Sequence, residues 1–215
     1  MGISAASKGS LIGVFGGTFD PIHCGHLAIA EALMCALPLE RILFVPAARP
    51  PHRIAPVASA RNRLEMVRLA LEGHPRFAVD EVEYGRVGPS YTADTLRALR
   101  ARYHRPLALI LGMDAFLGLP GWHRWRHLLG MAHLVIVTRP GFTEALPSWV
   151  RPRLATPAQL LTADHGLAVL VTTLERPESA TALRQALRHG PAPPGWLPAG
   201  VLEYIERHGL YQGKG

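Results

Sequence analysis

Two histidines near the start of the chain, His23 and His26, are the side chains best placed by type and spacing to do chemistry. They follow the glycine pair Gly16–Gly17 and are separated by two residues, one of which is Gly25. Glycines let the backbone approach a ligand closely, and the first turn of a helix offers free N–H groups to an anion. Two imidazoles at such a turn can donate hydrogen bonds to phosphate oxygens that gain charge during phosphoryl or nucleotidyl transfer. The segment therefore predicts a phosphate-binding turn, in which Gly25 leaves room for the anion.

Other interpretations of this segment fit its spacing less well. A Walker loop requires Gly-Lys-Ser or Gly-Lys-Thr, and a dinucleotide fingerprint requires GxGxxG, and the segment has neither. A zinc site made of His23, Cys24 and His26 lacks a fourth ligand at a familiar spacing. The remaining alternative is an ordinary turn whose histidines are satisfied by packing.

The elements that must position this turn alternate along the chain. Apolar runs rich in β-formers predict strands at residues 11–15, 41–46, 76–79, 107–111, 134–138 and 167–171. Helical spacing predicts helices at residues 25–37, 59–72, 92–103, 181–189 and 198–211. This alternation predicts an α/β fold with a doubly wound, Rossmann-like parallel sheet and helices on both faces. Such sheets bind ligands beyond the carboxyl ends of their strands.

One domain is expected over residues 11–215, with a small helical part at its C-terminal end and residues 1–10 as a disordered extension. The formal net charge is +7, but lysine occurs only twice and the arginines are scattered, so no basic arm indicates a nucleic-acid partner. An RNA-binding regulator on a degenerate nucleotide fold would need a focused basic patch with interleaved aromatics, which is absent.

No apolar run reaches the ~18 residues of a membrane span, and no secretory signal opens the chain, so a cytoplasmic protein without a membrane partner is expected. Cys24 and Cys35 are 11 residues apart in one predicted helix. At ~1.5 Å per residue they are too distant for a disulfide, and reduced thiols are expected.

Two further positions could contact a ligand, and each also has a purely structural explanation. Thr92 lies at a predicted helix start, where free N–H groups could hold a carboxylate, although simple capping by Ser90 or Thr92 explains the residue types equally well. Trp122 could stack on a cationic ring, with an interaction of roughly 0.5–2 kcal/mol. The alternative is a core tryptophan at helical spacing from Trp125.

Polar residues also follow two later strands. Asp114 comes after the strand that ends near Gly112, where it could recognise a nucleotide or cap a helix. Ser179, Thr181 and Arg184 begin the helix after the last strand, and together they predict a second anion site that faces the first.

The segment GGTFDPIHCGH, residues 16–26, resembles the signature of the HxGH nucleotidyltransferases. Four further segments, in the family's order, make the chain similar to the bacterial nicotinate-nucleotide adenylyltransferases. RPPHR at 49–53 resembles the family's Pro-Pro-His-Lys loop, with Arg53 for Lys, and SYTADTL at 90–96 resembles its Ser-Tyr-Thr-x-Asp-Thr-Leu helix start. LGMD at 111–114, followed by Leu119, Trp122 and Trp125, resembles its Leu-Gly-x-Asp…Leu-x-x-Trp-x-x-Trp element. ESATALR at 178–184 resembles its Ile-Ser-Ser-Thr-x-Ile-Arg, with Glu178 and Ala180 departing from the pattern, and the closing segment 201–211 also fits.

The resemblance implies transfer of AMP from ATP to nicotinate mononucleotide, which gives deamido-NAD and pyrophosphate. It implies that His23 and His26 are catalytic, and that Mg²⁺ is held by the nucleotide and water with no ligand from the protein. The implied residues for ATP and its phosphates are Gly16, Gly17, Thr18, Phe19, Gly25, Arg53, Gly112, Asp114, Ser179, Thr181 and Arg184. The implied residues for the nicotinate nucleotide are Ser90, Tyr91, Thr92 and Trp122, with Trp125 as a packing residue. The alternative is a sibling enzyme with another acceptor, such as nicotinamide mononucleotide or phosphopantetheine.

Overall fold

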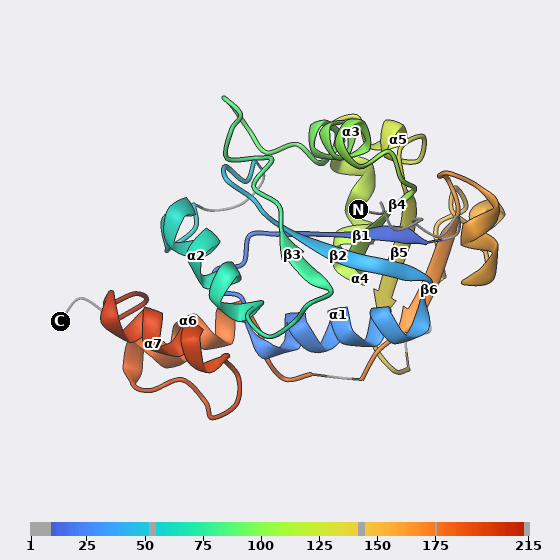
Figure 1. Ribbon diagram of the computed structural model, residues 1–215. Coiled ribbons are helices and arrows are strands. Elements are labelled where there is room, and N and C mark those ends of the chain that lie inside the picture. Colours follow the sequence, from blue (N-terminus) through green and yellow to red (C-terminus); the bar gives the residue numbers. More distant parts are fainter. Residues whose placement is uncertain (1–9, 52–54, 142–144, 175, 213–215) are drawn as a thin grey trace, which may run out of the picture.

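A six-stranded parallel sheet forms the centre of the chain, in the strand order β3–β2–β1–β4–β5–β6 (Figure 1). The computed structural model describes residues 10–51, 55–141, 145–174 and 176–212. The strands are β1 (Leu11–Gly17), β2 (Leu39–Pro46), β3 (Phe77–Val79), β4 (Leu107–Gly112), β5 (His133–Thr138) and β6 (Ala168–Thr172). The order reverses between β1 and β4, which makes the sheet doubly wound, as predicted.

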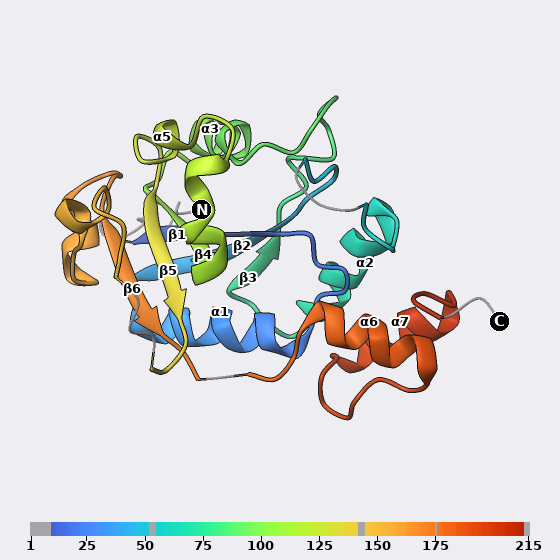
Figure 2. The same cartoon turned by 180° about the vertical axis from the view of Figure 1, so that it is seen from behind.

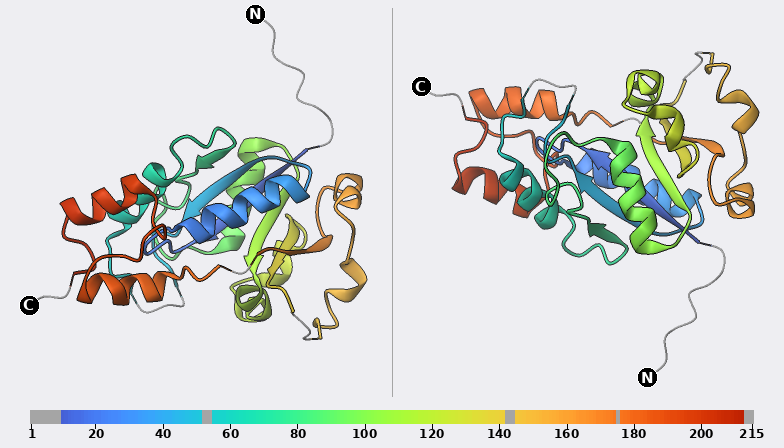
Figure 3. Two further views of the ribbon diagram at one scale, coloured as in Figure 1. Left: turned by 90° about the horizontal axis from the view of Figure 1, so that it is seen from below. Right: turned by 90° about the horizontal axis from the view of Figure 1, so that it is seen from above.

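Helices cover both faces of the sheet, and Figures 2 and 3 show the two helical layers from behind, below and above. One face carries α1 (Cys24–Ala36), α2 (Ala60–Ala70), α6 (Ala180–His189) and α7 (Ala199–Arg207). The other carries α3 (Thr92–Tyr103), α4 (Met113–Leu117) and α5 (Trp125–Leu128). The short 3₁₀ helices are η1 (Leu119–Gly121), η2 (Arg151–Arg153) and η3 (Ala158–Thr162). No helix among the described residues is long and apolar enough to cross a membrane.

Side chains alternate between the two faces along each central strand, because successive residues of a strand point to opposite sides. On β1, Phe15 packs toward α1 while Val14 packs toward α3. On β4, Ile110 and Leu109 divide in the same way. Both faces are apolar, so the strands are continuous apolar runs in the sequence, which is typical of a buried parallel sheet.

The predicted elements are all present, with shifted ends. β1 runs on to Gly17 and β2 begins at Leu39, while α3 has the predicted bounds. The last helix is shorter than predicted because α7 ends at Arg207 and a turn with left-handed residues at Gly209 and Tyr211 follows it. The short helices α4 and α5 were not predicted. The expectation for residues 1–10 lies almost wholly outside the described residues.

The loop between β1 and α1 is held by the carboxylate of Asp20, whose side chain is buried. It accepts hydrogen bonds from the N–H groups of Val57 and Ala58, at 2.8 and 3.0 Å, just before α2. It also accepts one from the hydroxyl of Tyr211 at 2.7 Å. Burial, followed by the nearby Asp20 carboxylate, raises the pKa of the Tyr211 hydroxyl, which therefore remains a donor. One side chain thus joins the loop, the start of α2 and the end of the chain.

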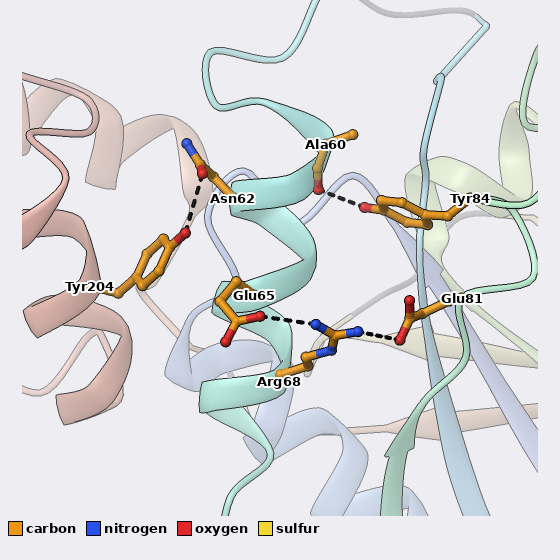
Figure 4. A network of polar contacts seen from close by, with 7 residues as sticks. All are labelled: Ala60, Asn62, Glu65, Arg68, Glu81, Tyr84 and Tyr204. Atoms are coloured by element: carbon orange, nitrogen blue, oxygen red, sulfur yellow. Dashed lines mark hydrogen bonds and ion pairs between the residues drawn. The ribbon is translucent and has the colours of Figure 1, made fainter.

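Helix α2 is fixed from two sides (Figure 4). The Tyr204 hydroxyl of α7 donates to Asn62 Oδ1 at 3.2 Å, and the Tyr84 hydroxyl donates to the carbonyl of Ala60 at 2.8 Å. Arg68 bridges Glu65 of the same helix and Glu81 of the segment after β3. Helix α7 is therefore attached to the sheet through α2.

Asp20→Ala is expected to lower the free energy of unfolding by about 3 kcal/mol, because it leaves three donors without their charged acceptor. Tyr211→Phe removes one of these bonds and should cost about 1.5 kcal/mol. Asp164→Ala, at an exposed carboxylate, is the matched control and should change stability by less than about 0.5 kcal/mol. Urea denaturation of the purified variants measures all three. Equal stabilities for Asp20→Ala and Asp164→Ala would contradict the role given to Asp20.

Candidate functional site

A cavity of about 380 Å³ lies at the carboxyl ends of β1 and β4, the point where the strand order reverses. This is the sheet edge at which the sequence predicts a ligand. Nine of the predicted site residues line it: Gly16, Gly17, Thr18, Ser90, Tyr91, Thr92, Gly112, Asp114 and Trp122. A Cβ on Gly16 or Gly112 would have no atom within 4 Å, so both backbones border open space.

Helix α3 begins at Thr92, on the wall of the cavity. Its N-cap is Tyr91, which makes no side-chain capping bond, so the alternative of capping by Ser90 or Thr92 is wrong. The Ser90 hydroxyl instead accepts a hydrogen bond from the N–H of Arg49 at 3.0 Å and so ties down the 49–51 segment. The first N–H groups of a helix have no full set of acceptors within it. Here the N–H of Asp94 donates to the Tyr91 carbonyl at 3.0 Å, and those of Thr92 and Ala93 have no acceptor among the described residues.

The two tryptophans have different surroundings. Trp122 is half-buried on the cavity wall and terminates η1, whereas Trp125 begins α5. The Trp125 ring packs edge-on against Trp149 at a centroid distance of 5.0 Å. Trp122 and Trp125 therefore do not share one helix face. Both pack against the same apolar cluster, so Trp122 is partly a core residue as well as part of the cavity wall.

Asp114 lies in the first turn of α4 and lines the cavity. The N-cap of that helix is Gly112, so the alternative of Asp114 as a helix cap is also wrong. Its carboxylate is left for the cavity or solvent.

The cavity wall also contains residues that the sequence analysis missed. Thr95 donates to Glu83 Oε1 and accepts from Arg86, both at 2.6 Å. His123 stacks on Tyr91 at a centroid distance of 4.2 Å. Glu83 follows β3 in a segment without periodicity, so no sequence pattern indicates that it is buried.

His23 and His26 lie beside this cavity and not in its wall. Their rings are 3.7 Å apart between centroids. The backbone N–H of His23 donates to Nδ1 of the His26 ring at 3.2 Å. A neutral imidazole whose Nδ1 accepts must carry its proton on Nε2, so His26 presents an Nε2–H donor.

The pKa of both histidines is lowered by burial. Desolvation lowers the pKa of His23 to about 4, although the carboxylate of Glu178 opposes this. Desolvation, followed by the neighbouring His23, lowers the pKa of His26 well below its usual value. Both rings are therefore neutral at neutral pH in the ligand-free protein.

Aromatic packing connects the histidines to the cavity. The His26 ring lies 5.1 Å from that of Phe19 and 6.0 Å from that of Phe15, which lines the cavity. Phe19 has a left-handed backbone, and a Cβ on Gly17 would lie 2.8 Å from its ring. Only glycine fits at position 17, because the Phe19 ring fills the space of a side chain there.

The start of α6 adjoins the start of α1. Ser179 caps α6 by accepting from the N–H of Ala182 at 3.1 Å. Arg184 donates to the carbonyl of Asp20 at 2.6 Å and to the Thr181 hydroxyl at 3.3 Å. The predicted second anion site is therefore attached to the same loop as the histidines. Arg184 has a structural role in addition to its charge. Arg53 lies outside the described residues.

Cys24 and Cys35 are both free thiols. Burial, and then Glu178, raises the pKa of the Cys24 thiol, so it is a poor nucleophile at neutral pH. Within the described ranges, no group of three or more His, Cys, Asp or Glu side chains could hold a metal ion.

Comparisons with known proteins agree with this geometry. The cytidylyltransferase-like family model matches residues 14–186. A protein of Pectobacterium atrosepticum named "Probable nicotinate-nucleotide adenylyltransferase" is 45% identical over 211 residues, which cover 94% of this chain and 99% of that protein. A relative of the same name from Aeromonas hydrophila is 45% identical over 207 residues, which cover 94% and 97%.

A solved structure with a similar fold is that of Plasmodium falciparum nicotinic acid mononucleotide adenylyltransferase complexed with NaAD. It superposes with a TM-score of 0.71 at 15% identity and covers 94% of this chain and 97% of its own.

Gly25→Ala is expected to weaken ATP binding roughly 10-fold, because small displacements of binding groups have large effects. The added Cβ would lie 3.0 Å from His23 Nδ1 and 3.4 Å from Glu178 Cβ, so the His23 ring must move. Gly200→Ala is the matched control, since it is also the second residue of a helix and its Cβ meets only Leu69 at 3.7 Å. Calorimetric titration with ATP should show a change below about twofold for this control. Equal affinities for the two variants would contradict the tight packing at Gly25.

Proposed function

The chain belongs to the nicotinate-nucleotide adenylyltransferases, and from this membership we propose that it transfers AMP from ATP to nicotinate mononucleotide. The products are deamido-NAD and pyrophosphate, and the reaction is a step of NAD biosynthesis. The observation that carries the proposal is one cavity bordered by bare glycine backbone at the ends of β1 and β4 and by the open start of α3. It offers an approach for phosphates and a separate place for a carboxylate.

In this proposal the nicotinate nucleotide occupies the α3 side of the cavity. The pyridine carboxylate accepts hydrogen bonds from the free N–H groups at Thr92, where the helix dipole favours a negative charge. The pyridinium ring stacks on Trp122, which gains roughly 0.5–2 kcal/mol from the cation–π interaction. Ser90 and Tyr91 hold the backbone before the helix in place.

ATP occupies the side formed by β1 and β4. The backbones of Gly16, Gly17, Thr18 and Gly112 let the nucleotide approach closely, and Asp114 accepts hydrogen bonds from it. The triphosphate extends past Phe19 to the start of α1, where Gly25 leaves room and the histidines donate to its oxygens. Ser179, Thr181 and Arg184 provide the second contact at the start of α6, and Arg53 adds a positive charge.

The chemistry needs no general base. The 5′-phosphate of the acceptor is already an anion at neutral pH, and one of its oxygens attacks the α-phosphorus of ATP. The bond from that phosphorus to the β-phosphate oxygen breaks, and pyrophosphate leaves with the electron pair. The Nε2–H of His26 and the His23 ring stabilise the charge that develops on the leaving group, while the cavity aligns the reactants.

A divalent cation, Mg²⁺, suits this site as a companion of the nucleotide. Among the described residues no group of three or more side chains could ligate a metal, so in this proposal phosphate oxygens and water would hold the ion. When bound, the ion neutralises charge on the triphosphate.

Both cysteines are free, in keeping with a reducing compartment. We place the enzyme in the cytoplasm, where it acts on small molecules without a nucleic-acid or membrane partner.

The alternative acceptors differ in what they would present to α3. Phosphopantetheine has no ring to stack on Trp122 and no carboxylate for the helix start. Nicotinamide mononucleotide has the ring but a neutral amide, which gains less from the helix dipole. The acid is therefore the favoured substrate.

A pyrophosphate-release assay with ATP tests this proposal. We expect wild-type protein to use nicotinate mononucleotide at least about 10-fold more efficiently than nicotinamide mononucleotide. His26→Ala should lower kcat by roughly 100- to 1,000-fold, as is usual when a donor to the developing charge is lost.

His189→Ala, at an exposed histidine near the end of α6, is the matched control and should stay within about twofold of wild type. Absence of pyrophosphate with either mononucleotide would reject the proposed reaction. A near-normal rate for His26→Ala would reject the role of that histidine.

A further inference from the structure

Glu178 is a buried carboxylate that the mechanism above does not use. It lies between β6 and α6, and only 4% of its side chain is exposed. Its Oε1 accepts a hydrogen bond from Arg176 at 2.7 Å, while its Oε2 is buried and has no partner. A buried carboxylate oxygen without a hydrogen bond is costly, so its position calls for a nearby donor.

His23 also has a buried polar atom without a hydrogen-bond partner. Its Nδ1 is buried and makes no hydrogen bond, because the N–H of His26, which faces the His23 side chain in a capping box, donates to the His23 carbonyl at 2.9 Å. The Glu178 Cβ and Nδ1 of His23 both lie within 3.4 Å of the point that a Cβ on Gly25 would occupy. The described residues contain two other buried side-chain atoms without a partner, and these belong to Glu83, on the wall of the cavity, and to Arg86, which donates to the cavity residue Thr95. The two residues that carry these unpaired atoms, Glu178 and His23, therefore lie next to each other at the start of α1.

The charges around His23 come from two segments. From α1, the His26 ring lies against it, tilted by 34°, and Cys24 is its neighbour in sequence. From the segment before α6 come Glu178 and Arg176, which is paired with Oε1 of Glu178. Among these groups, Glu178 is the one that raises the pKa of His23, against the desolvation that lowers it.

Resting on the proposed function, we propose that Glu178 is a positioning residue that accepts a hydrogen bond from Nδ1–H of His23 and lets this histidine bind the triphosphate as an imidazolium. The bound polyanion supplies the second negative charge, and the proton comes from solvent, so His23 carries one proton on each nitrogen. Nδ1–H then donates to Glu178 Oε2 and Nε2–H donates to phosphate. No covalent bond forms or breaks in this step.

Only one of the two rings takes the charge. Two imidazolium rings at a centroid distance of 3.7 Å would repel each other. His26 already uses its Nδ1 to accept from the backbone, so protonation there would break a hydrogen bond. His26 therefore remains a neutral donor, and His23 is the cation beside the leaving group.

The pH dependence of kcat/KM for ATP separates this role from a merely structural one. Wild-type activity should fall on an alkaline limb as the His23 imidazolium of the complex loses its proton. In Glu178→Gln and Glu178→Ile that limb should move to lower pH by about one unit, the low end of the effect of a nearby opposite charge. At about pH 8 these variants should lose roughly 10-fold in kcat/KM, and near pH 6 much less.

Glu178→Asp should restore the wild-type limb, because it keeps the charge. Glu203→Gln removes a carboxylate from an exposed ion pair on α7 and should leave the profile unchanged. Thermal unfolding of each variant shows whether it is folded. Identical alkaline limbs in wild type, Glu178→Gln and Glu178→Ile would overturn the inference.

A second measurement does not depend on turnover. In protein labelled with ¹³C at histidine Cε1, the His23 resonance, assigned with His23→Asn, is titrated with and without inorganic triphosphate. The pKa of His23 should rise on binding in wild type and rise less, by about one unit, in Glu178→Gln. An equal rise in both proteins would overturn the inference. If the His23 pKa rises more in wild type than in Glu178→Gln, but wild type releases no pyrophosphate with nicotinate mononucleotide, only the proposed function is overturned.

Discussion

One buried carboxylate, that of Asp20, fixes the loop on which the site depends. It ties the turn after β1 to the start of α2 and to Tyr211 near the end of the chain. The carbonyl of the same residue accepts from Arg184, so α6 is attached to the loop as well. His23 and His26 follow within six residues, so the hydrogen bonds of Asp20 also fix the position of their rings. Three segments far apart in sequence are thus held around one turn.

The parallel sheet supplies the second constraint. Because all six strands run in the same direction, the starts of α1, α3 and α6 come to the same edge. Each start presents N–H groups without a helical acceptor, and together they favour anions. The substrates of the proposed reaction carry their negative charge at two ends, as a triphosphate and a carboxylate. The fold places helix starts at both.

Much of this arrangement could be predicted from the sequence. The alternation of apolar strands and helices was sufficient for the doubly wound sheet, and the residues from Gly16 to His26 predicted a turn at the sheet edge that borders the cavity. Local chemistry was a poorer guide. Ser90 and Asp114 were both candidate helix caps, but neither caps a helix, because Ser90 bonds to a residue 41 positions away and Gly112 precedes α4.

What the sequence did not reveal depends on contacts between distant segments. The bond from Thr95 to Glu83 and the approach of Glu178 to His23 arise only when separate loops meet. Glu178 appeared in the sequence as a departure from the family pattern without an assigned effect. Its burial beside an unpartnered ring nitrogen shows that the exchange places a charge at the start of α1.

The most direct test of the account is a crystal structure of the protein with nicotinate mononucleotide and a non-hydrolysable ATP analogue. The account predicts Nε2 of His23 and His26 within about 3.2 Å of phosphate oxygens of the analogue, with the pyridine ring over Trp122. A nucleotide bound elsewhere, or imidazoles turned inward or chelating zinc, would contradict it.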